Sequence, residues 1–230
     1  MVAPPACSAD EVPAPAFCPV CRSPGPLPFK RVDGWDYWRC AHCEARFLDP
    51  RHRMSSVEEH AQYLNHENDP DDPGYRRFLS KLIDPLLQRL GAGLNGGQEG
   101  LDFGCGPGPA LASMLREAGH GMALYDPFFQ PDRAVLSRTY DFVTCTEVVE
   151  HFYHPADRFD QLDNLLRPGG WLGVMTCFQT DDDRFANWHY RRDPTHVVFY
   201  REATLRAIAA VHGWCCEIPV KDVALMQKPF

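Results

Sequence analysis

Four cysteines form two closely spaced pairs near the start of the chain, Cys18-Pro-Val-Cys21 and Cys40-Ala-His-Cys43. Two C-x2-C pairs at this separation are typical of a structural zinc site, where four thiolates surround the ion tetrahedrally and leave no position open. The alternative is four buried or redox-active thiols, and His42 could replace one ligand. The spacing favours zinc, and so small a module would draw much of its folding free energy from the metal.

A glycine-rich turn follows the apolar run at residues 100–103. It contains Asp102 and then Gly104, Gly106 and Gly108. Glycines at a strand-to-helix turn let the backbone lie against a ligand. An acid two residues before the first glycine would repel a pyrophosphate and attract an amino group, which disfavours a dinucleotide. Asp126 ends the next apolar run, where a carboxylate can accept hydrogen bonds from ribose hydroxyls; the alternative is a helix N-cap.

A third set of polar side chains follows another apolar run, in Glu147-Val-Val-Glu150-His151. On a helix these three residues would share one face, because they are spaced i, i+3 and i+4. Two carboxylates and an imidazole would make three ligands for a hard or borderline cation. The side chains that could take a proton from a weak nucleophile are Glu147, Glu150, His151, His154, His189, Tyr190, His196 and Tyr200.

The elements that must hold these residues alternate between strand and helix. Strands are predicted at 100–103, 122–125, 142–145 and 171–176, with helices at 110–118 and 156–166, and a last helix at 202–212 precedes two short strands. Such alternation implies a mainly parallel sheet with helices on both faces. The carboxyl edge of that sheet, where ligands bind in such folds, would carry the glycine turn and Glu147 to His151.

Four regions are predicted along the chain. Residues 1–16, rich in proline and alanine, form a flexible tail, and 17–48 form the zinc ribbon, with a hairpin turn at Asp33-Gly34. Residues 49–99 form a helical lead-in that covers the cofactor. Residues 100–230 form the catalytic core, with a polar and aromatic lid at about 178–200.

Composition narrows the functional classes. The 230 residues have 44% apolar content and a net charge of −8, which argues against nucleic-acid binding by bulk electrostatics. No stretch reaches the roughly 18 to 20 apolar residues that span a bilayer, and no signal peptide opens the chain, so a cytoplasmic protein with reduced thiols is expected.

Taken together, the motifs resemble the ordered landmarks of class I S-adenosylmethionine-dependent methyltransferases over about residues 75–230. The matching landmarks are the glycine turn, Asp126, the segment Asp141 to Glu147 with Glu150-His151, and Leu166-Arg-Pro-Gly-Gly170. The resemblance implies a Rossmann-like, seven-stranded, mainly parallel sheet, with Leu166 to Gly170 as the turn before the fifth strand. Only residues 127–140 separate Asp126 from Asp141, so the third strand is compressed and the adenine contacts cannot be placed.

The same resemblance implies the cofactor site. Asp102 and the three glycines would surround the methionine part of S-adenosylmethionine, and Asp126 its ribose. Tyr75 would also contact the cofactor, since relatives close over it with residues before the first strand. Glu147 would be a further contact of the cofactor. The alternative for Tyr75 is helix packing.

The chain also resembles the ubiquinone-biosynthesis O-methyltransferases, which have a Glu-x-x-Glu-His element and a Thr-His pair in the lid. Thr195-His196 matches the second element. His196 would then be either a general base or the fourth ligand of a second divalent cation such as Mg²⁺. The other three ligands would be Glu147, Glu150 and His151. The alternative is that His151 packs beside the cofactor and the glutamates cap a helix.

Three functions remain open. The first is an enzyme that methylates a hydroxyl group of a small or lipid-like molecule, with His196, His151 and Glu147 as catalytic residues. The second is an RNA or protein methyltransferase whose ribbon recruits the macromolecule, and the third is a non-catalytic, cofactor-binding interaction protein. In the lid, Trp188, Tyr190, Phe199 and Tyr200 could form a substrate wall or pin the lid to the core.

Overall fold

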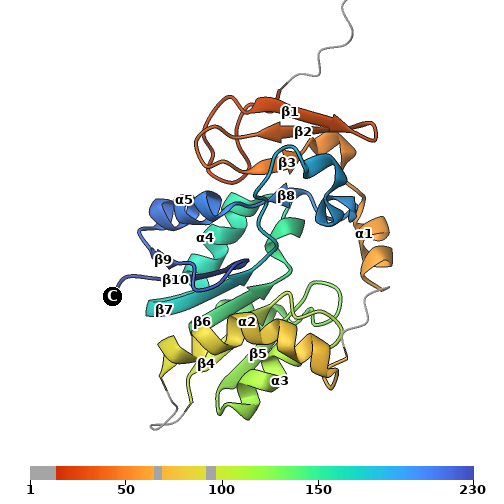
Figure 1. The fold of residues 1–230 in the computed structure, drawn as a ribbon. Helices are drawn as coiled ribbons and strands as arrows, with labels where there is room; N and C mark the ends of the chain where they lie inside the picture. The colour runs from red at the N-terminus through yellow and green to blue at the C-terminus, as the bar shows by residue number, and fades with distance from the viewer. Residues whose placement is uncertain (1–13, 65–68, 92–96) are drawn as a thin grey trace, which may run out of the picture.

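A small antiparallel sheet lies at one end of the molecule (Figure 1). The computed structural model describes residues 14–64, 69–91 and 97–230, so nearly all of the predicted tail lies outside the described residues. The strands of the small sheet are β1 (Leu27–Val32), β2 (Trp35–Arg39), β3 (Arg46–Leu48) and β8 (Val198–Phe199), in that order. Asp33 and Gly34 both have positive φ, as a tight hairpin turn requires, which confirms the predicted hairpin.

The larger sheet is mixed and has the order β5-β4-β6-β7-β10-β9. Its strands are β4 (Glu99–Phe103), β5 (Gly121–Tyr125), β6 (Tyr140–Thr146), β7 (Leu166–Met175), β9 (Cys215–Glu217) and β10 (Val223–Gln227). The first four run parallel, and β10 is antiparallel to both β7 and β9. The chain leaves β4 toward β5 and returns on its other side as β6. Ligands bind at such a switch point, outside the carboxyl ends of the strands.

Helices cover both faces of this sheet (Figure 1). They are α1 (Ser56–Tyr63), α2 (Pro73–Leu90), α3 (Ala110–Glu117), α4 (Pro155–Leu165) and α5 (Glu202–His212). Apolar side chains of α2 and α3 form one core with Phe142 and Leu225, while α4 and α5 contribute to the core on the other face. The alternation of strands and helices predicted from the sequence is confirmed. In the part of the chain that the structure describes, no helix is long and apolar enough to span a bilayer.

Two sequence expectations about this sheet are corrected. The described part of the sheet has six strands, not seven, because a 3-10 helix, η2 (Arg133–Ser137), occupies the segment between β5 and β6. Asp132 starts η2 by accepting a hydrogen bond from Ala134 N at 2.9 Å, so the short connection folds as a capped turn. Residues 167–170, expected as a turn before the fifth strand, belong to β7 as a bulge opposite Asp141.

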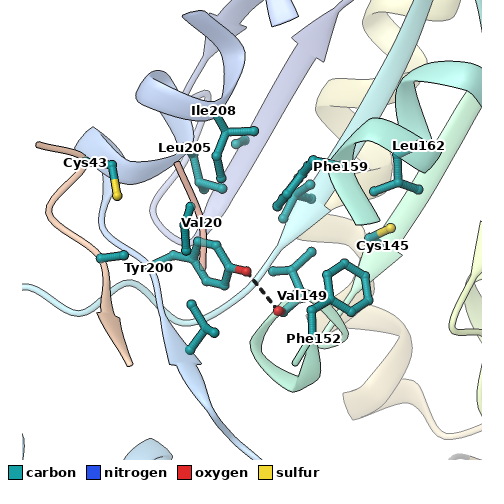
Figure 2. Close-up of a cluster of buried hydrophobic side chains, with 14 of the residues drawn as sticks. Val20, Cys43, Cys145, Val149, Phe152, Phe159, Leu162, Tyr200, Leu205 and Ile208 are labelled. Carbon is teal, nitrogen blue, oxygen red and sulfur yellow. Dashed lines mark hydrogen bonds between the residues drawn. The ribbon is translucent and has the colours of Figure 1, made fainter. Parts of the chain in front are cut away.

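The small sheet shares its core with the larger domain. Buried side chains of the ribbon, such as Val20 and Cys43, belong to one cluster with Phe159 of α4 and Leu205 of α5. Figure 2 shows Tyr200 at the centre of this cluster, with its hydroxyl donating to the Val149 carbonyl oxygen at 2.9 Å. The ribbon is therefore packed into the catalytic fold rather than tethered beside it.

Candidate functional site

A cavity of 610 Å³ opens at the carboxyl ends of β4 and β6, at the switch point of the sheet. That volume is within the usual range of small-molecule sites. Its wall contains every residue that the sequence assigned to the cofactor: Tyr75, Asp102, Gly104, Gly106, Gly108, Asp126 and Glu147. His151 and His196 line it as well, whereas Glu150 does not. The fold therefore brings both sets of predicted residues to one place.

The glycine turn is sterically constrained at Gly104. Its φ is +82°, and a Cβ there would lie 2.4 Å from a methyl carbon of Val148. Gly104 N donates to the Tyr125 carbonyl oxygen at 2.7 Å, which ties the turn to the end of β5. A side chain at this position would thus be strained by its backbone and would clash with the loop after β6.

Two carboxylates flank the glycine turn. Asp102 is buried and accepts a hydrogen bond from Thr144 Oγ1 at 2.8 Å. Burial, despite that hydrogen bond, raises the pKa of Asp102 to about 6. Asp126 accepts from Gly106 N at 3.1 Å and, through its other oxygen, from Phe128 N and Phe129 N. A carboxylate has about four lone-pair sites, so one remains for a ligand rather than the two that a pair of ribose hydroxyls would need.

The reaction side of the cavity holds His151 and His196. His151 Nδ1 lies 3.1 Å from the Thr195 carbonyl oxygen, and His196 Nδ1 lies 2.7 Å from that of Tyr190. A carbonyl oxygen can only accept, so each ring donates from Nδ1 and its neutral form carries the lone pair on Nε2. Burial lowers the pKa of His196, which favours that neutral form.

Glu150 completes a compact group with the two histidines. One nitrogen of each ring and one Glu150 oxygen all lie within 4.8 Å of one another. Glu150 is fully buried and accepts hydrogen bonds from Thr176 Oγ1 at 2.9 Å and from Tyr190 Oη at 2.5 Å. Ring nitrogens fixed by backbone carbonyls beside a hydrogen-bonded carboxylate are the usual support of metal ligands in proteins. The group is thus suited either to a cation or to proton removal.

The shared helical face predicted for Glu147, Glu150 and His151 is wrong. Glu147 N still donates to the Met175 carbonyl oxygen of β7, and the φ of Glu147 is +53°. Only Val149–His151 then form one 3-10 turn, η3. Glu147 consequently lies outside the compact group and reaches Glu150 through the Tyr190 hydroxyl, 3.1 Å from its Oε2. Burial and the Glu150 charge raise the pKa of Glu147 to about 8.

The remaining candidates separate into two groups. His154 lines the cavity, whereas His189 is exposed and contributes nothing to its wall. Of the two roles left open for the lid aromatics, the structure favours packing against the core: Trp188, Tyr190, Phe199 and Tyr200 are absent from the lining and pack against one another and the ribbon. Phe199 and Tyr200 are fully buried, so these side chains fasten the segment to the core.

Several wall residues were not singled out from the sequence. They are Glu59, Phe128, Phe129, Tyr153, Arg158 and Asp193. Phe128 and Phe129 directly follow Asp126-Pro127, so an aromatic pair after the ribose acid was an available signal. Glu59 and Tyr63 come from α1, and Tyr63 meets the His151 ring at 5.3 Å between centroids. Residues 49–99 were expected to cover the cofactor, but nothing in the local pattern of α1 indicates which of its side chains face the cavity.

The four ribbon cysteines converge as predicted. Cys18 Sγ lies 3.7 Å from Cys43 Sγ, and Cys21 Sγ lies 3.6 Å from Cys40 Sγ. Zinc–sulfur bonds of about 2.3 Å in a tetrahedron place sulfur atoms about 3.8 Å apart, so the spacing fits a zinc ion. The residue after the second cysteine of each pair, Arg22 or Glu44, has a φ of +59°. The two pairs therefore form the same kind of turn. No disulfide joins the four.

Comparisons with known proteins gave a family match and several similar solved structures. A family model described as a methyltransferase domain matches residues 75–216, more than half of the chain. A search of curated proteins found no match. Among solved structures, an O-methyltransferase family protein from Burkholderia thailandensis is 15% identical, with TM-score 0.48 over 74% of this chain and 67% of that one.

Two further structures are similar at the same level. The 1,6-didemethyltoxoflavin-N1-methyltransferase of Burkholderia thailandensis is 16% identical, with TM-score 0.45 over 89% of this chain and 100% of that one. The magnesium protoporphyrin IX methyltransferase of Synechocystis is 15% identical, with TM-score 0.49 over 76% and 94%. The match of the family model across the glycine turn, Asp126 and the loop after β6 shows that this chain belongs to the class I S-adenosylmethionine-dependent methyltransferases.

Proposed function

We propose that this methyltransferase acts on an oxygen atom of a small or lipid-like hydroxyl compound and that a neutral imidazole removes the hydroxyl proton. The observation that supports the proposal is the orientation of the His196 ring, whose Nδ1 lies 2.7 Å from the Tyr190 carbonyl oxygen, so that its neutral form carries the lone pair on Nε2. His196 and His151 both line the cavity that also contains the glycine turn. A general base must reach the proton that it abstracts, and an imidazole in the cavity wall meets that condition for an acceptor bound there.

The chain would hold S-adenosylmethionine through the residues of the glycine turn. Asp102, Gly104, Gly106 and Gly108 would surround the methionine part, with Tyr75 and Glu147 beside it, and Asp126 would accept one ribose hydroxyl. When bound, S-adenosylmethionine supplies the electrophilic methyl group. Nε2 of a histidine takes the acceptor's proton, the acceptor oxygen bonds to the methyl carbon, and the carbon–sulfur electron pair stays on sulfur.

A small acceptor is supported by the shape and charge of the site. The cavity is walled by aromatic side chains such as Phe128, Phe129 and Tyr153. Its wall has one arginine, Arg158, against five acidic residues: Glu59, Asp102, Asp126, Glu147 and Asp193. A polyanionic nucleic acid would be repelled by such a wall and by the net charge of −8. An RNA or protein substrate recruited by the ribbon is the competing proposal, and a cofactor-binding interaction protein without turnover is the third.

A metal-assisted version of the same reaction has its own support. Glu150, His151 and His196 could bind one divalent cation, which would lower the pKa of an acceptor hydroxyl. Two imidazoles and one carboxylate suit zinc or iron better than the Mg²⁺ named as an example from the sequence, because Mg²⁺ prefers oxygen ligands. Glu147 is not a member of this set, so its proposed role is confined to the cavity wall.

The deciding experiment incubates the purified protein and a cell extract with methyl-labelled S-adenosylmethionine, and separates small molecules, protein and RNA. Label in the small-molecule fraction that hydrogen iodide releases as methyl iodide, as it does from a methyl ether or ester but not from an N-methyl group, supports the proposal. Label in RNA or protein contradicts the acceptor class. Label nowhere, with tight binding of S-adenosylhomocysteine, favours the interaction protein.

Metal content separates the two versions. Elemental analysis should find one equivalent of zinc per chain if the histidines act as bases, and a second metal if Glu150, His151 and His196 bind a cation. Glu150→Gln should remove that second equivalent and leave the ribbon zinc in place. A single equivalent in both proteins contradicts the metal-assisted version.

A further inference from the structure

The ribbon sheet is completed by a strand from the catalytic domain. β8 pairs with β3 in antiparallel register, with Arg46 opposite Phe199 and Phe47 opposite Val198. β8 is only two residues long and follows His196 after a single residue. The strand that continues the ribbon is thus the same short segment that carries an imidazole of the cavity.

Val197 connects the two sides through its backbone. Its N–H donates to the Glu150 carbonyl oxygen at 2.9 Å, and its own carbonyl oxygen accepts from Leu48 N at 2.9 Å. Leu48 belongs to β3 of the ribbon. Two consecutive hydrogen bonds therefore connect the ribbon through Val197 to Glu150, whose side chain lies beside both histidines. The Tyr200 hydroxyl adds a third bond, to the Val149 carbonyl oxygen (Figure 2).

An ion pair between a buried arginine and a partly exposed aspartate ties the ribbon to the segments around β8. Arg46 of β3, whose side chain is only 5% exposed, donates to Asp182 through Nη2 at 2.8 Å and through Nε at 3.2 Å. Asp182 also accepts from Arg201 Nη2 at 2.8 Å. Burial opposes ionisation of Asp182, but the hydrogen bond and charge of Arg46, with the charge of Arg201, keep its pKa below the usual value. The Asp182 carboxylate thus joins Arg46 of the ribbon to Arg201, which follows β8.

The zinc-binding turns are anchored to the other side of the site. The carbonyl oxygen of Pro19, between Cys18 and Cys21, accepts from Ala156 N in the first turn of α4 at 3.0 Å. Val20 in the same turn is buried beside Tyr200 and Val149 (Figure 2). The four cysteines therefore join a turn that contacts α4 with the turn that leads into β3.

We propose that the zinc ribbon is a positioning element of the methyl-transfer site: the bound zinc fixes β3, and β3 holds β8 and Val197 so that Glu150 and His196 keep their relative places. Asp182 is the positioning residue that links the ribbon to this segment. The proposal rests on the site assignment above. It extends that assignment by giving the ribbon a role in the geometry of the reaction rather than in recruitment of a partner. Coupling of this kind is reciprocal, so weakening the link must also loosen the zinc.

The test uses the full-length, zinc-loaded protein and two matched variants. Asp182→Asn keeps the shape of the side chain but leaves Arg46 without its counter-charge. Asp157→Asn is the control, because it weakens another ion pair between ribbon and core, Arg22 with Asp157 and Asp160, that is exposed to solvent. Neither Asp182 nor Asp157 is one of the zinc ligands, and neither lines the cavity.

Hydrogen–deuterium exchange and zinc affinity are the readouts, and neither requires a known methyl acceptor. For Asp182→Asn we expect amides of residues 149–151 and 196–200 to exchange about tenfold faster, the low end of the effect of losing a hydrogen bond to a charged group. Zinc release to a competing chromogenic chelator, measured at equilibrium, should show a zinc dissociation constant that is higher by a similar factor. Exchange at 101–106 and the dissociation constant of S-adenosylhomocysteine should stay at wild-type values, as should every property of Asp157→Asn.

The proposal is overturned if faster exchange in Asp182→Asn is confined to residues near position 182, or if the zinc dissociation constant is unchanged. It is also overturned if exchange rises equally at 101–106, because the substitution would then destabilise the whole domain rather than the site. Failure of these readouts would leave methylation of an oxygen intact. Conversely, label found in RNA or protein would refute the acceptor class without touching the coupling.

Discussion

The imidazole rings of His151 and His196 meet edge to face, with their centroids 4.7 Å apart. They come from η3 and from the residue two before β8, so the contact joins segments 45 positions apart in the chain. Because backbone carbonyls hold both Nδ1 atoms, each ring can serve as a base only through Nε2.

We expect His196→Ala to lower kcat by roughly 10²- to 10⁴-fold, the usual contribution of a general base. Binding of S-adenosylhomocysteine should be unchanged, because His196 is not part of the glycine turn, which lies between β4 and α3. In the wild type, burial lowers the pKa of His196, so kcat should fall only when the pH drops below the ordinary histidine range. Label transfer to the accepting extract fraction, measured from pH 5 to 9, checks both points.

His189→Ala is the matched control for this prediction. His189 lies in the same segment but is exposed and absent from the cavity wall, so its loss should leave kcat and the pH profile unaltered. Equal effects of the two substitutions would refute a specific role for His196. Retained activity in His196→Ala with loss in His151→Ala would move the base to His151.

Glu147 gives a prediction on stability against pH. Burial and the Glu150 charge raise its pKa to about 8 in the folded protein, whereas an unfolded chain titrates near 4.3. The folded state therefore binds more protons between these values, and the contribution of Glu147 to stability decreases as the pH rises from about 4 to about 8. Glu147→Gln, which stays neutral, should be more stable relative to wild type at pH 9 than at pH 6.

Urea unfolding at the two pH values measures this difference. Glu202→Gln serves as the control, because Glu202 is half-exposed and pairs with Arg206 on the surface of α5. That variant should keep the wild-type pH dependence. A constant difference between Glu147→Gln and wild type at pH 6 and 9 would mean that Glu147 is ionised throughout, which would contradict its assigned environment.

Gly104→Ala tests whether the glycine turn needs its close approach to Val148. Gly104 and Gly34 have nearly equal φ, +82° and +85°, but a Cβ at Gly34 would have no heavy atom within 4 Å. Both alanine variants should lose about 1 to 2 kcal/mol from the left-handed backbone. Gly104→Ala should lose about 1 to 3 kcal/mol more from overpacking and should bind S-adenosylhomocysteine at least tenfold more weakly. Equal stability losses would contradict the clash.

Asp126 provides a prediction on cofactor affinity. Three backbone N–H groups, from Gly106, Phe128 and Phe129, already donate to its two oxygens. An amide at this position would turn its NH₂ group toward at least one of these donors, so Asp126→Asn should disorder the glycine turn as well as lose a ribose contact. We expect titration calorimetry to show about tenfold to hundredfold weaker binding of S-adenosylhomocysteine, from one or two lost charge-assisted hydrogen bonds. Wild-type affinity would remove Asp126 from the cofactor site.

The parts of this fold that follow local periodicity were predictable. The strands and helices from β4 to β7, and the convergence of the four cysteines, depend on patterns of a few residues repeated along the chain. Between β5 and β6 the expectation failed, because Pro131 and Asp132 favour a capped 3-10 turn over a strand in so short a connection. The Asp132 cap was visible in the sequence, but the family resemblance argued for a strand there.

The relative placement of the site residues could not be predicted in the same way. Glu147 adopts positive φ because its backbone still pairs with β7 while η3 begins two residues later, and no property of a glutamate indicates this. The pairing of β8 with β3 joins residues about 150 positions apart through only two ladder positions. Such contacts are fixed by tertiary packing, so the sequence located the candidate residues but not the compact group that excludes Glu147.

The shared core leads to a last prediction, on how the protein unfolds. Val20 and Cys43 of the ribbon, and Tyr200 and Leu205 of the catalytic domain, lie in one buried cluster (Figure 2). Zinc that binds only the folded ribbon must then stabilise the whole cluster by mass action. Calorimetry of the zinc-loaded protein should show one transition, and Cys43→Ser, which removes one ligand, should lower the Tm of that single transition. A separate low-temperature transition that disappears in Cys43→Ser, with the main Tm unchanged, would show instead that the ribbon unfolds independently and that its packing against α4 and α5 contributes little.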